Sequence, residues 1–445
     1  EEIVLPASLT LEGKPITEYK IVIPATTLSL YDKTNRNGNI LLDADKFKGV
    51  DLPKQLAENA ADYINDEIEK LTGTRLTVIT DATEDTGSEI VIGSTSRVIA
   101  KEYNNSELTG MKFGISANEE DVLLSGKDFL IAGAAYYFVN TLIAGNEAAE
   151  IDIPDEGIVE EPTPETPKNF IYFIGDGMGQ NHPKLLGSNL PLVENEYILM
   201  QHTFAGYRFP NQGLAKTRSA DNEVTDSAAG GTALATGYKT NNHYVGLAPD
   251  GKTVLTNLSE LAHGLGYKTA VLSTDTQTGA TPSAFSAHVL DRGMAEDIKT
   301  MQDQMLADGT IDILRCGFGD NYFLTTIENT LSSLTADNEK GFFMMYEEAH
   351  IDKNSHQSMR NETYWAMARG NMAIIKFMEF AMYHPDTMMI ITADHETGGL
   401  TKMGTYQFTS GGKHTGADVP VIGYGLGTEI FNGATVDNTA IPKVI

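Results

Sequence analysis

The sequence predicts an α/β protein in which a small α/β domain precedes a larger domain with a largely parallel central sheet flanked by helices. Three observations support this prediction. From residue 169 to the end of the chain, apolar strand patterns alternate with helical ones, which is typical of βαβ units and parallel sheets. Residues 1–150 form a smaller mixture of helix and strand patterns. Residues 151–168 concentrate proline and glutamate, as a stiff charged linker would.

The individual elements follow from hydrophobic periodicity and turn residues. In the first domain we expect an amphipathic helix, two strands, two further strands and an apolar helix, at 54–72, 75–80, 89–93, 111–124 and 129–143. In residues 169–445 we expect strands at 170–174, 269–273, 342–346 and 387–392, and helices from Ser227 and over about 358–382. The run from Phe129 to Gly145 is marginal for a bilayer span and contains Asn140 and Thr141, so we expect a buried helix and no transmembrane segment.

Composition limits the class of protein. The 445 residues carry 32 Lys+Arg against 61 Asp+Glu, a formal net charge of -29, which argues against nucleic acid or an anionic membrane as the main partner. The single cysteine, Cys316, excludes an intrachain disulfide and a thiolate metal cluster, and we expect it in the core. The chain begins at Glu1 with neither a basic segment nor an initiator methionine, as a mature or trimmed form would.

Three predicted strands of the larger domain run directly into acids or a histidine. Asp176 follows the first of them, Glu347 the third, and Asp394 with His395 the fourth. In open α/β sheets, ligands bind at the carboxyl ends of the strands. We therefore expect a functional site at this edge of the sheet.

Three more residues could bind a metal ion. Asp352 and His356 are four residues apart, so on a helical turn they can share one ion, although such pairs are also common on solvated helices. His414 lies in the segment GGKHTG, which we expect to be a flexible loop. Oxygen and imidazole ligands without sulfur suit zinc in a catalytic site.

Ser227 lies between an acid, Asp226, and a run of very small residues. A serine exposed at the start of a helix faces free backbone N–H groups and the positive end of the helix dipole, which favour an anion such as phosphate. The alternative is an ordinary N-cap serine on a buried alanine-rich helix.

Together these segments resemble the alkaline phosphatase family. The matching segments, in the family's order, are IGDGMG (174–179), VTDSAAGGTALATG (224–237), GATPSAFSAHVLDR (279–292), YEEAHIDKNSHQ (346–357), TADHETGG (392–399) and KHTG (413–416). The resemblance spans nearly all of residues 169–445 and implies the fold of that family. It also implies a phosphomonoester hydrolase that acts on small phosphomonoesters in an extracellular, periplasmic or cell-surface location, and it is compatible with a homodimer.

The resemblance further implies two zinc ions and one magnesium ion. The implied ligands are Asp352, His356 and His414 for the first zinc, Asp394, His395 and Asp176 for the second, and Asp176, Thr281 and Glu347 for magnesium. Ser227 matches the nucleophile that becomes phosphorylated, and Arg292 matches the guanidinium that grips two phosphate oxygens. Zinc would supply the deprotonation that a serine hydroxyl needs, and water activated at the first zinc would hydrolyse the phosphoserine.

The chain departs from the family pattern at Gly279, because relatives commonly have Asp or His two residues before the matched threonine. We therefore expect weaker magnesium binding. Asp226 is expected either to orient Arg292 through an ion pair or to act only as a helix-start acid. Lys353 could reach the phosphate through water, or it could simply be solvated.

The remaining histidines and the only tryptophan are expected to lie outside the chemistry. We expect structural roles for His288 and His350 and core packing for Trp365, while His182 and His243 have no defined role.

Two alternative functions remain open. A phosphodiesterase on the same scaffold is one, although nucleotide diesterases of this scaffold typically use threonine where this chain has Ser227. The other is a surface glycan-binding protein with a silent phosphatase-like domain. In its favour, the last half of residues 1–150 weakly resembles the small α/β domain at the N-terminus of several glycoside hydrolases, which implies possible glycan contact there.

Overall fold

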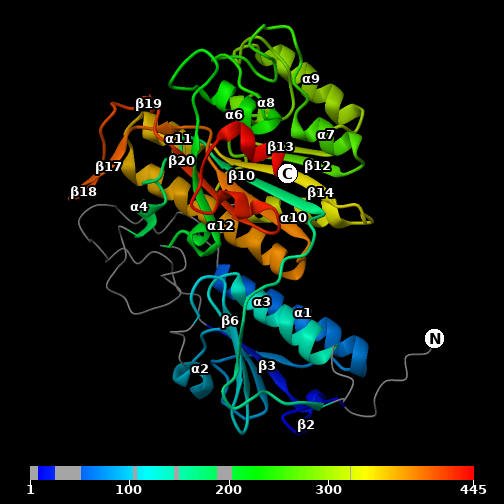
Figure 1. Cartoon of the computed structure of the whole chain (residues 1–445). Helices are drawn as coiled ribbons and strands as arrows, with labels where there is room; N and C mark the ends of the chain where they lie inside the picture. Colours follow the sequence, from blue (N-terminus) through cyan, green and yellow to red (C-terminus); the bar gives the residue numbers. More distant parts are fainter. Residues whose placement is uncertain (1–8, 26–51, 104–107, 145–149, 188–202, 321) are drawn as a thin grey trace.

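The computed structural model describes residues 9–25, 52–103, 108–144, 150–187, 203–320 and 322–445. These residues form two α/β units, a smaller one from the N-terminal part and a larger one from the rest (Figure 1). Parts of the predicted first domain, residues 1–8, 26–51, 104–107 and 145–149, lie outside the described residues.

The N-terminal unit is built on a six-stranded sheet of order β4-β3-β5-β7-β6-β9, with a second, three-stranded sheet of order β2-β1-β8. Its strands are β1 (Thr10–Leu11), β2 (Lys14–Pro15), β3 (Lys20–Ile23), β4 (Val78–Thr80), β5 (Glu89–Ile92), β6 (Phe113–Ala117), β7 (Val122–Gly126), β8 (Glu150–Ile151) and β9 (Ile158–Glu160). Its helices are α1 (Leu52–Thr72), α2 (Val98–Glu102) and α3 (Leu130–Tyr137). All four residues of β5 are buried, as is typical of a strand covered on both faces.

Two expectations for this unit need correction. The strand predicted from residue 75 begins only at Val78, because the Asn65 side chain of α1 bonds both the N–H (2.8 Å) and the carbonyl (3.1 Å) of Leu76. The predicted linker contains β9, which pairs with β6, and its first residue, Ile151, pairs with Leu11 of β1. A short edge strand forms because it pairs with a neighbouring strand, so its own sequence carries little strand signal.

The apolar run from Phe129 forms a buried helix, as predicted. It begins as α3 and continues without a break as a π-helical turn over Phe138–Ile143. Among the described helices, none is long and apolar enough to cross a membrane.

The larger unit has an eight-stranded central sheet of order β13-β12-β14-β10-β15-β20-β11-β21. Its strands are β10 (Asn169–Gly175), β11 (Asn211–Lys216), β12 (Lys268–Ser273), β13 (Ile313–Cys316), β14 (Phe342–Glu348), β15 (Thr387–Thr392), β20 (Val419–Tyr424) and β21 (Thr435–Asp437). Only β20 runs against the others, so the sheet is largely parallel as predicted. Two short two-stranded sheets, β16 (Glu396–Thr397) with β19 (His414–Thr415) and β17 (Leu400–Met403) with β18 (Thr405–Phe408), lie beside it.

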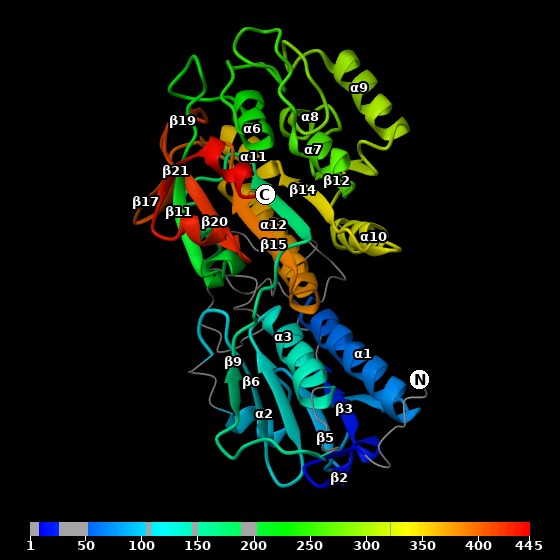
Figure 2. The ribbon, with the colours of Figure 1, turned by 45° about the vertical axis from the view of Figure 1, so that its right-hand side comes forward.

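Helices cover both faces of this sheet (Figure 2). They are α4 (Lys184–Gly187), α6 (Ser227–Thr236), α7 (Leu258–Gly264), α8 (Ala280–Ala284), α9 (Ala295–Ala307), α10 (Phe323–Thr335), α11 (His350–His356) and α12 (Arg360–Tyr383). Helix α12 is buried over most of its length because one side packs on β10, β14 and β15 and another packs on α3 of the N-terminal unit. A helix covered on several sides needs no continuous polar face.

Side chains also connect the two units. Tyr63 of α1 packs on Tyr383 with ring centroids 4.5 Å apart, and the Asn59 amide donates to the Glu379 carboxylate at 2.7 Å. Arg208 donates two hydrogen bonds to the fully buried Asp128 carboxylate, at 2.7 and 2.9 Å. The N-terminal unit is therefore packed firmly against the larger one.

Candidate active site

The register of the central sheet brings the strand-end acids to one edge. Ile174 of β10 pairs with Glu347 of β14 and with Thr392 of β15. Asp176 and Asp394 each follow two residues later, so acids from three neighbouring strands gather at the carboxyl end of the sheet. This is the arrangement that the strand-end pattern predicted.

Ser227 is the first residue of α6 and is only 3% exposed. The N-cap is Asp226, whose side chain accepts from the Ala229 N–H at 3.0 Å, so the alternative in which Ser227 is only an N-cap is wrong. The Ser227 hydroxyl is left free to lie 3.1 Å from His395 Nε2. The small residues that follow allow close packing, because a Cβ on Gly230 would lie 2.9 Å from the Asp394 carbonyl oxygen.

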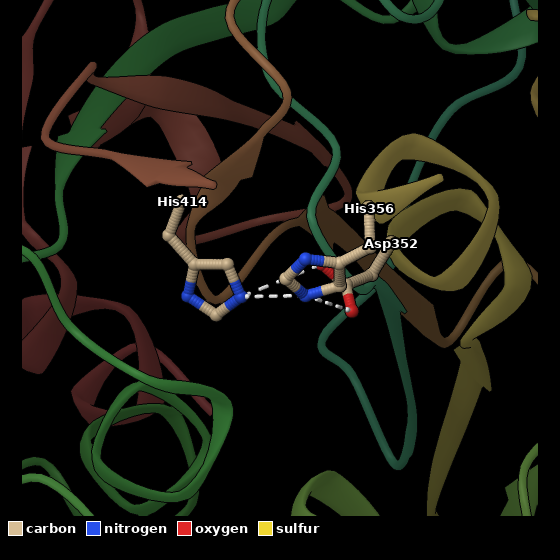
Figure 3. A group of neighbouring side chains, drawn as sticks. All are labelled: Asp352, His356 and His414. Atoms are coloured by element: carbon tan, nitrogen blue, oxygen red, sulfur yellow. Dashed lines mark hydrogen bonds and ion pairs between the residues drawn. The ribbon is translucent and has the colours of Figure 1, made fainter. Parts of the chain in front are cut away.

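Asp352, His356 and His414 form one cluster of metal-binding groups (Figure 3). The Nε2 atoms of His356 and His414 are 3.1 Å apart. His356 Nε2 lies 3.3 Å from Asp352 Oδ2, and His414 Nε2 lies 3.6 Å from Asp352 Oδ1. Ligand atoms around a tetrahedral zinc with bonds of about 2.0–2.1 Å lie about 3.3–3.4 Å apart. The three groups are therefore spaced as zinc ligands would be.

Backbone carbonyls orient both rings of this cluster. His356 Nδ1 donates to Gly412 at 2.5 Å, and His414 Nδ1 donates to Thr225 at 3.0 Å. In a neutral ring the lone pair is then on Nε2, which faces the cluster. Gly412 must be glycine, because its φ is +75° and a Cβ there would collide with the His356 carbonyl.

His414 lies in the short strand β19, where it pairs with Thr397, rather than in a flexible loop as expected. Pairing with β16 holds the ring in place although the surrounding glycines give no strand signal in the sequence.

A second cluster surrounds His395. Its Nε2 lies 3.2 Å from Asp394 Oδ2 and 3.5 Å from Asp176 Oδ1. Thr397 Oγ1 donates to Asp352 at 2.5 Å and accepts from His395 Nδ1 at 3.2 Å, which again leaves the lone pair on Nε2. Among the described residues, the buried oxygens Asp176 Oδ1 and Asp394 Oδ2 have no hydrogen-bond partner. Since buried charged oxygens are rarely left unpaired, a cation fits between them.

Burial dominates the electrostatics of these acids. It raises the pKa of Asp394 to about 7 and the pKa of Glu347 to about 8, and it raises the pKa of Asp176 well above its usual range. Burial also acts on Asp352, but the neighbouring His356 and His395 rings and the hydrogen bond from Thr397 hold the pKa of that carboxyl below its usual range. Positive charge would relieve the repulsion among these carboxylates.

The predicted magnesium ligands Glu347 and Thr281 belong to β14 and α8, and both are buried. The Thr281 hydroxyl is near enough to lower the pKa of Glu347, and the Ser273 hydroxyl donates a short hydrogen bond to the same carboxylate. Oxygen ligands of the kind that a magnesium ion prefers are therefore available here.

The alkaline phosphatase family model matches residues 167–318 and 324–411, which is more than half of the chain. The chain belongs to the alkaline phosphatase family. Every predicted site residue except His414 lies in the matched ranges, and the N-terminal unit up to residue 166 lies outside them.

Individual alkaline phosphatases agree with this result. Alkaline phosphatase 4 of Bacillus subtilis is 29% identical over 325 residues, covering 59% of this chain and 69% of that protein. The alkaline phosphatase of Schizosaccharomyces pombe is 27% identical over 315 residues, covering 54% of this chain and 57% of that protein. The structure of the alkaline phosphatase from the Antarctic bacterium TAB5 superposes with a TM-score of 0.55 at 27% identity, covering 63% of this chain and 97% of that one.

In this alkaline phosphatase fold, Arg292 lies beside the predicted nucleophile. Its Nη1 is 3.4 Å from Asp226 Oδ2, and the same oxygen accepts from the His243 N–H at 3.1 Å. Asp226 therefore does both: one of its oxygens contacts Arg292, and its other oxygen caps α6.

We expect Asp226→Asn and Asp226→Ala to separate these two purposes. Asparagine is a good N-cap and alanine is not, so only the alanine variant should lose about 1 kcal/mol of unfolding free energy. Both variants remove the charge that orients Arg292, so both should raise the inhibition constant of inorganic phosphate several-fold. Urea unfolding and phosphate inhibition measure the two effects. Equal stability losses, or unchanged phosphate inhibition, would contradict this division.

Three other histidines and Trp365 occupy structural positions. His288 bonds Glu260 and the Gly246 carbonyl, both at 2.9 Å. His182 accepts from the Gly179 N–H and bonds Ser355, both at 3.1 Å, and burial lowers its pKa to about 4. His350 bonds Arg369 at 3.0 Å, and Trp365 is buried as predicted. Cys316, expected in the core, is only partly buried against it.

Sequence reasoning missed three polar residues of the site, Thr397, Ser273 and Asp275. Thr397 orients His395, and Ser273 bonds Glu347. Asp275 forms an ion pair with Lys353, so the Lys353 ammonium is not simply solvated. The signal for Asp275 was present in the sequence, because it follows the strand β12 as closely as the other acids follow theirs.

Proposed function

We propose that this protein is a phosphomonoester hydrolase that uses Ser227 as nucleophile and binds two zinc ions and one magnesium ion. The observation that supports this most is the position of the Ser227 hydroxyl, 3.1 Å from His395 Nε2. The same nitrogen lies 3.5 Å from Asp176 Oδ1 and 3.2 Å from Asp394 Oδ2, two buried oxygens without a hydrogen-bond partner among the described residues. The first zinc would be held by Asp352, His356 and His414, the second by Asp394, His395 and Asp176, and magnesium by Asp176, Thr281 and Glu347.

When bound, the metal ions would lower the pKa of the serine hydroxyl and of water and offset negative charge on the phosphate. Ser227 attacks phosphorus, the bond from phosphorus to the alcohol oxygen breaks, and the alcohol leaves with one proton. A water molecule then hydrolyses the phosphoserine, which returns Ser227 with its proton and releases inorganic phosphate. The N-terminus of α6 directs its backbone N–H groups toward the negative charge of the phosphoryl group.

Arg292 is suited to bind the phosphoryl group. Its side chain is partly exposed, at 36%, and its guanidinium is held at one nitrogen by Asp226, so other N–H groups can bind two phosphate oxygens at once. A phosphomonoester presents more unsubstituted oxygens than a diester, which favours monoesters at such a clamp.

We expect wild-type enzyme to hydrolyse p-nitrophenyl phosphate with a kcat/KM at least about 100-fold above that for bis(p-nitrophenyl) phosphate. Arg292→Lys should lower the monoester value by about 10- to 100-fold, because lysine cannot make the bidentate contact. The diester value should fall less. Comparable rates for the two substrates would instead support the phosphodiesterase alternative.

The glycan-binding alternative is less favoured because the nucleophile and every implied metal ligand are present. Glycan contact through residues 1–150, a homodimer, and an extracellular, periplasmic or cell-surface location remain proposals from the resemblances alone.

A further inference from the structure

Gly279 has no conformational reason to be glycine. Its φ of -57° and ψ of 152° are open to any residue. It is the N-cap of α8 but provides no side-chain cap, although Ser, Asp or Asn would stabilise a helix there. The glycine must therefore be required by space rather than by backbone shape.

The Asp275 carboxylate fills the space next to Gly279. A Cβ at position 279 would lie 2.9 Å from Asp275 Cγ and closer still to Oδ2. Such a separation is too short for carbon atoms that are not bonded to each other. Any side chain at position 279 would thus displace the Asp275 carboxylate, which comes from the loop after β12.

Asp275 is held firmly and is mostly buried, with its side chain 16% exposed. Its Oδ1 accepts from the Thr276 N–H at 2.6 Å and from the Lys353 ammonium. Its own N–H donates to Ser273 Oγ at 2.8 Å, and that hydroxyl donates to Glu347. Asp275 therefore connects Lys353 of α11 to the proposed magnesium ligand Glu347.

We propose that Asp275 is a positioning residue of the phosphatase site, which holds the Lys353 ammonium toward the phosphate and supports the magnesium site in place of the side chain missing at Gly279. This inference rests on the proposed function. The proposal implies that one carboxylate fills this space, and that it can come from position 275 or from position 279 but not from both.

Three variants test the exchange: Asp275→Ala, Gly279→Asp and the double variant. The readouts are the thermal midpoint, calorimetric binding of magnesium to enzyme that was stripped by chelation and restored with zinc, and the inhibition constant of inorganic phosphate. Asp275→Ala should weaken magnesium binding about 10-fold or more and raise the phosphate inhibition constant, with little change in the thermal midpoint. Gly279→Asp alone should lower the midpoint by several degrees because two carboxylates compete for one space. The double variant should regain the midpoint and much of the magnesium affinity.

Asp303→Ala is the matched control, because it also removes a carboxylate, here from an exposed ion pair with Lys299 on α9. It should leave all three readouts unchanged. Wild-type magnesium affinity and phosphate inhibition in Asp275→Ala would overturn the proposal, and so would a double variant no better than Gly279→Asp. Loss of the proposed function would be recognised separately, by full turnover in a Ser227→Ala enzyme whose position 275 is intact.

Discussion

We expect the Ser227→Ala enzyme to hydrolyse a phosphomonoester at least about 10⁴-fold more slowly than wild type, because it loses the only nucleophile proposed for the reaction. The fold should survive this change. The N-cap of α6 is Asp226, and the Ser227 hydroxyl makes a hydrogen bond only to His395 among the described residues. Removing one such bond should alter the unfolding free energy by no more than about 1.5 kcal/mol.

Steady-state turnover with p-nitrophenyl phosphate and mass spectrometry after an acid quench measure the effect. Wild type should yield one phosphorylated peptide containing Ser227, and the variant none. Ser259→Ala is a suitable control, because Ser259 is also buried near a helix start but its hydroxyl has no hydrogen-bond partner among the described residues. It should retain wild-type turnover. A phosphopeptide elsewhere, or full activity of Ser227→Ala, would contradict the proposed nucleophile.

The second large effect is expected on metal removal. Chelated enzyme should lose at least about 10³-fold in turnover and recover it when zinc and magnesium are restored. The opposing possibility is that His395 acts as a general base without metal, because the bonds from Ser227 to His395, Thr397 and Asp352 form a continuous chain. Activity that survives chelation, with metal analysis showing no residual zinc, would support that chain instead.

The stability of the chelated protein should also depend on pH. Asp394 and Glu347 have folded pKa values of about 7 and about 8, above the ordinary values of about 4 for unfolded carboxyls. The folded state therefore holds protons that the unfolded state has released. The thermal midpoint of the metal-free protein should fall as pH rises from about 4 to about 8.

Bound metal ions would replace those protons, so the metal-loaded protein should keep its thermal midpoint over the same pH range. Thermal melts at several pH values, with and without metals, make the comparison. Asp394→Asn in the metal-free protein removes one of the raised pKa values and should flatten the dependence. A midpoint that is equally flat in loaded and metal-free wild type would contradict the presence of a cation among these acids.

The strand-end acids could be predicted from the sequence because a parallel sheet leaves little choice of geometry. Asp176, Glu347 and Asp394 each lie at the end of a buried apolar strand, and any parallel order of those strands brings them to one edge. The pair Asp352 and His356 could be predicted for a similar reason, since residues four apart on a helix share a face. Repeating structures convert spacing in the sequence into position in space.

Other features could not be predicted because they depend on contacts between distant segments. His414 was expected in a flexible loop, but β16 orders it and the Thr225 carbonyl sets its tautomer. The expected linker contains β9 because β6 offers a free edge. Ser227 was open to a role as helix cap until the fold showed that Asp226 takes that role.

The sequence by itself determined which chemical groups the chain carries and at which strand ends and helix starts they lie, because those depend on local periodicity. Only the tertiary structure decided how they meet. It placed Asp352 in two clusters that also contain histidines, left Asp176 Oδ1 and Asp394 Oδ2 buried without a hydrogen-bond partner among the described residues, and put the Asp275 carboxylate in the space beside Gly279. These facts depend on packing and burial, where distances of a few ångström between segments far apart in the chain set charge, pKa and reactivity.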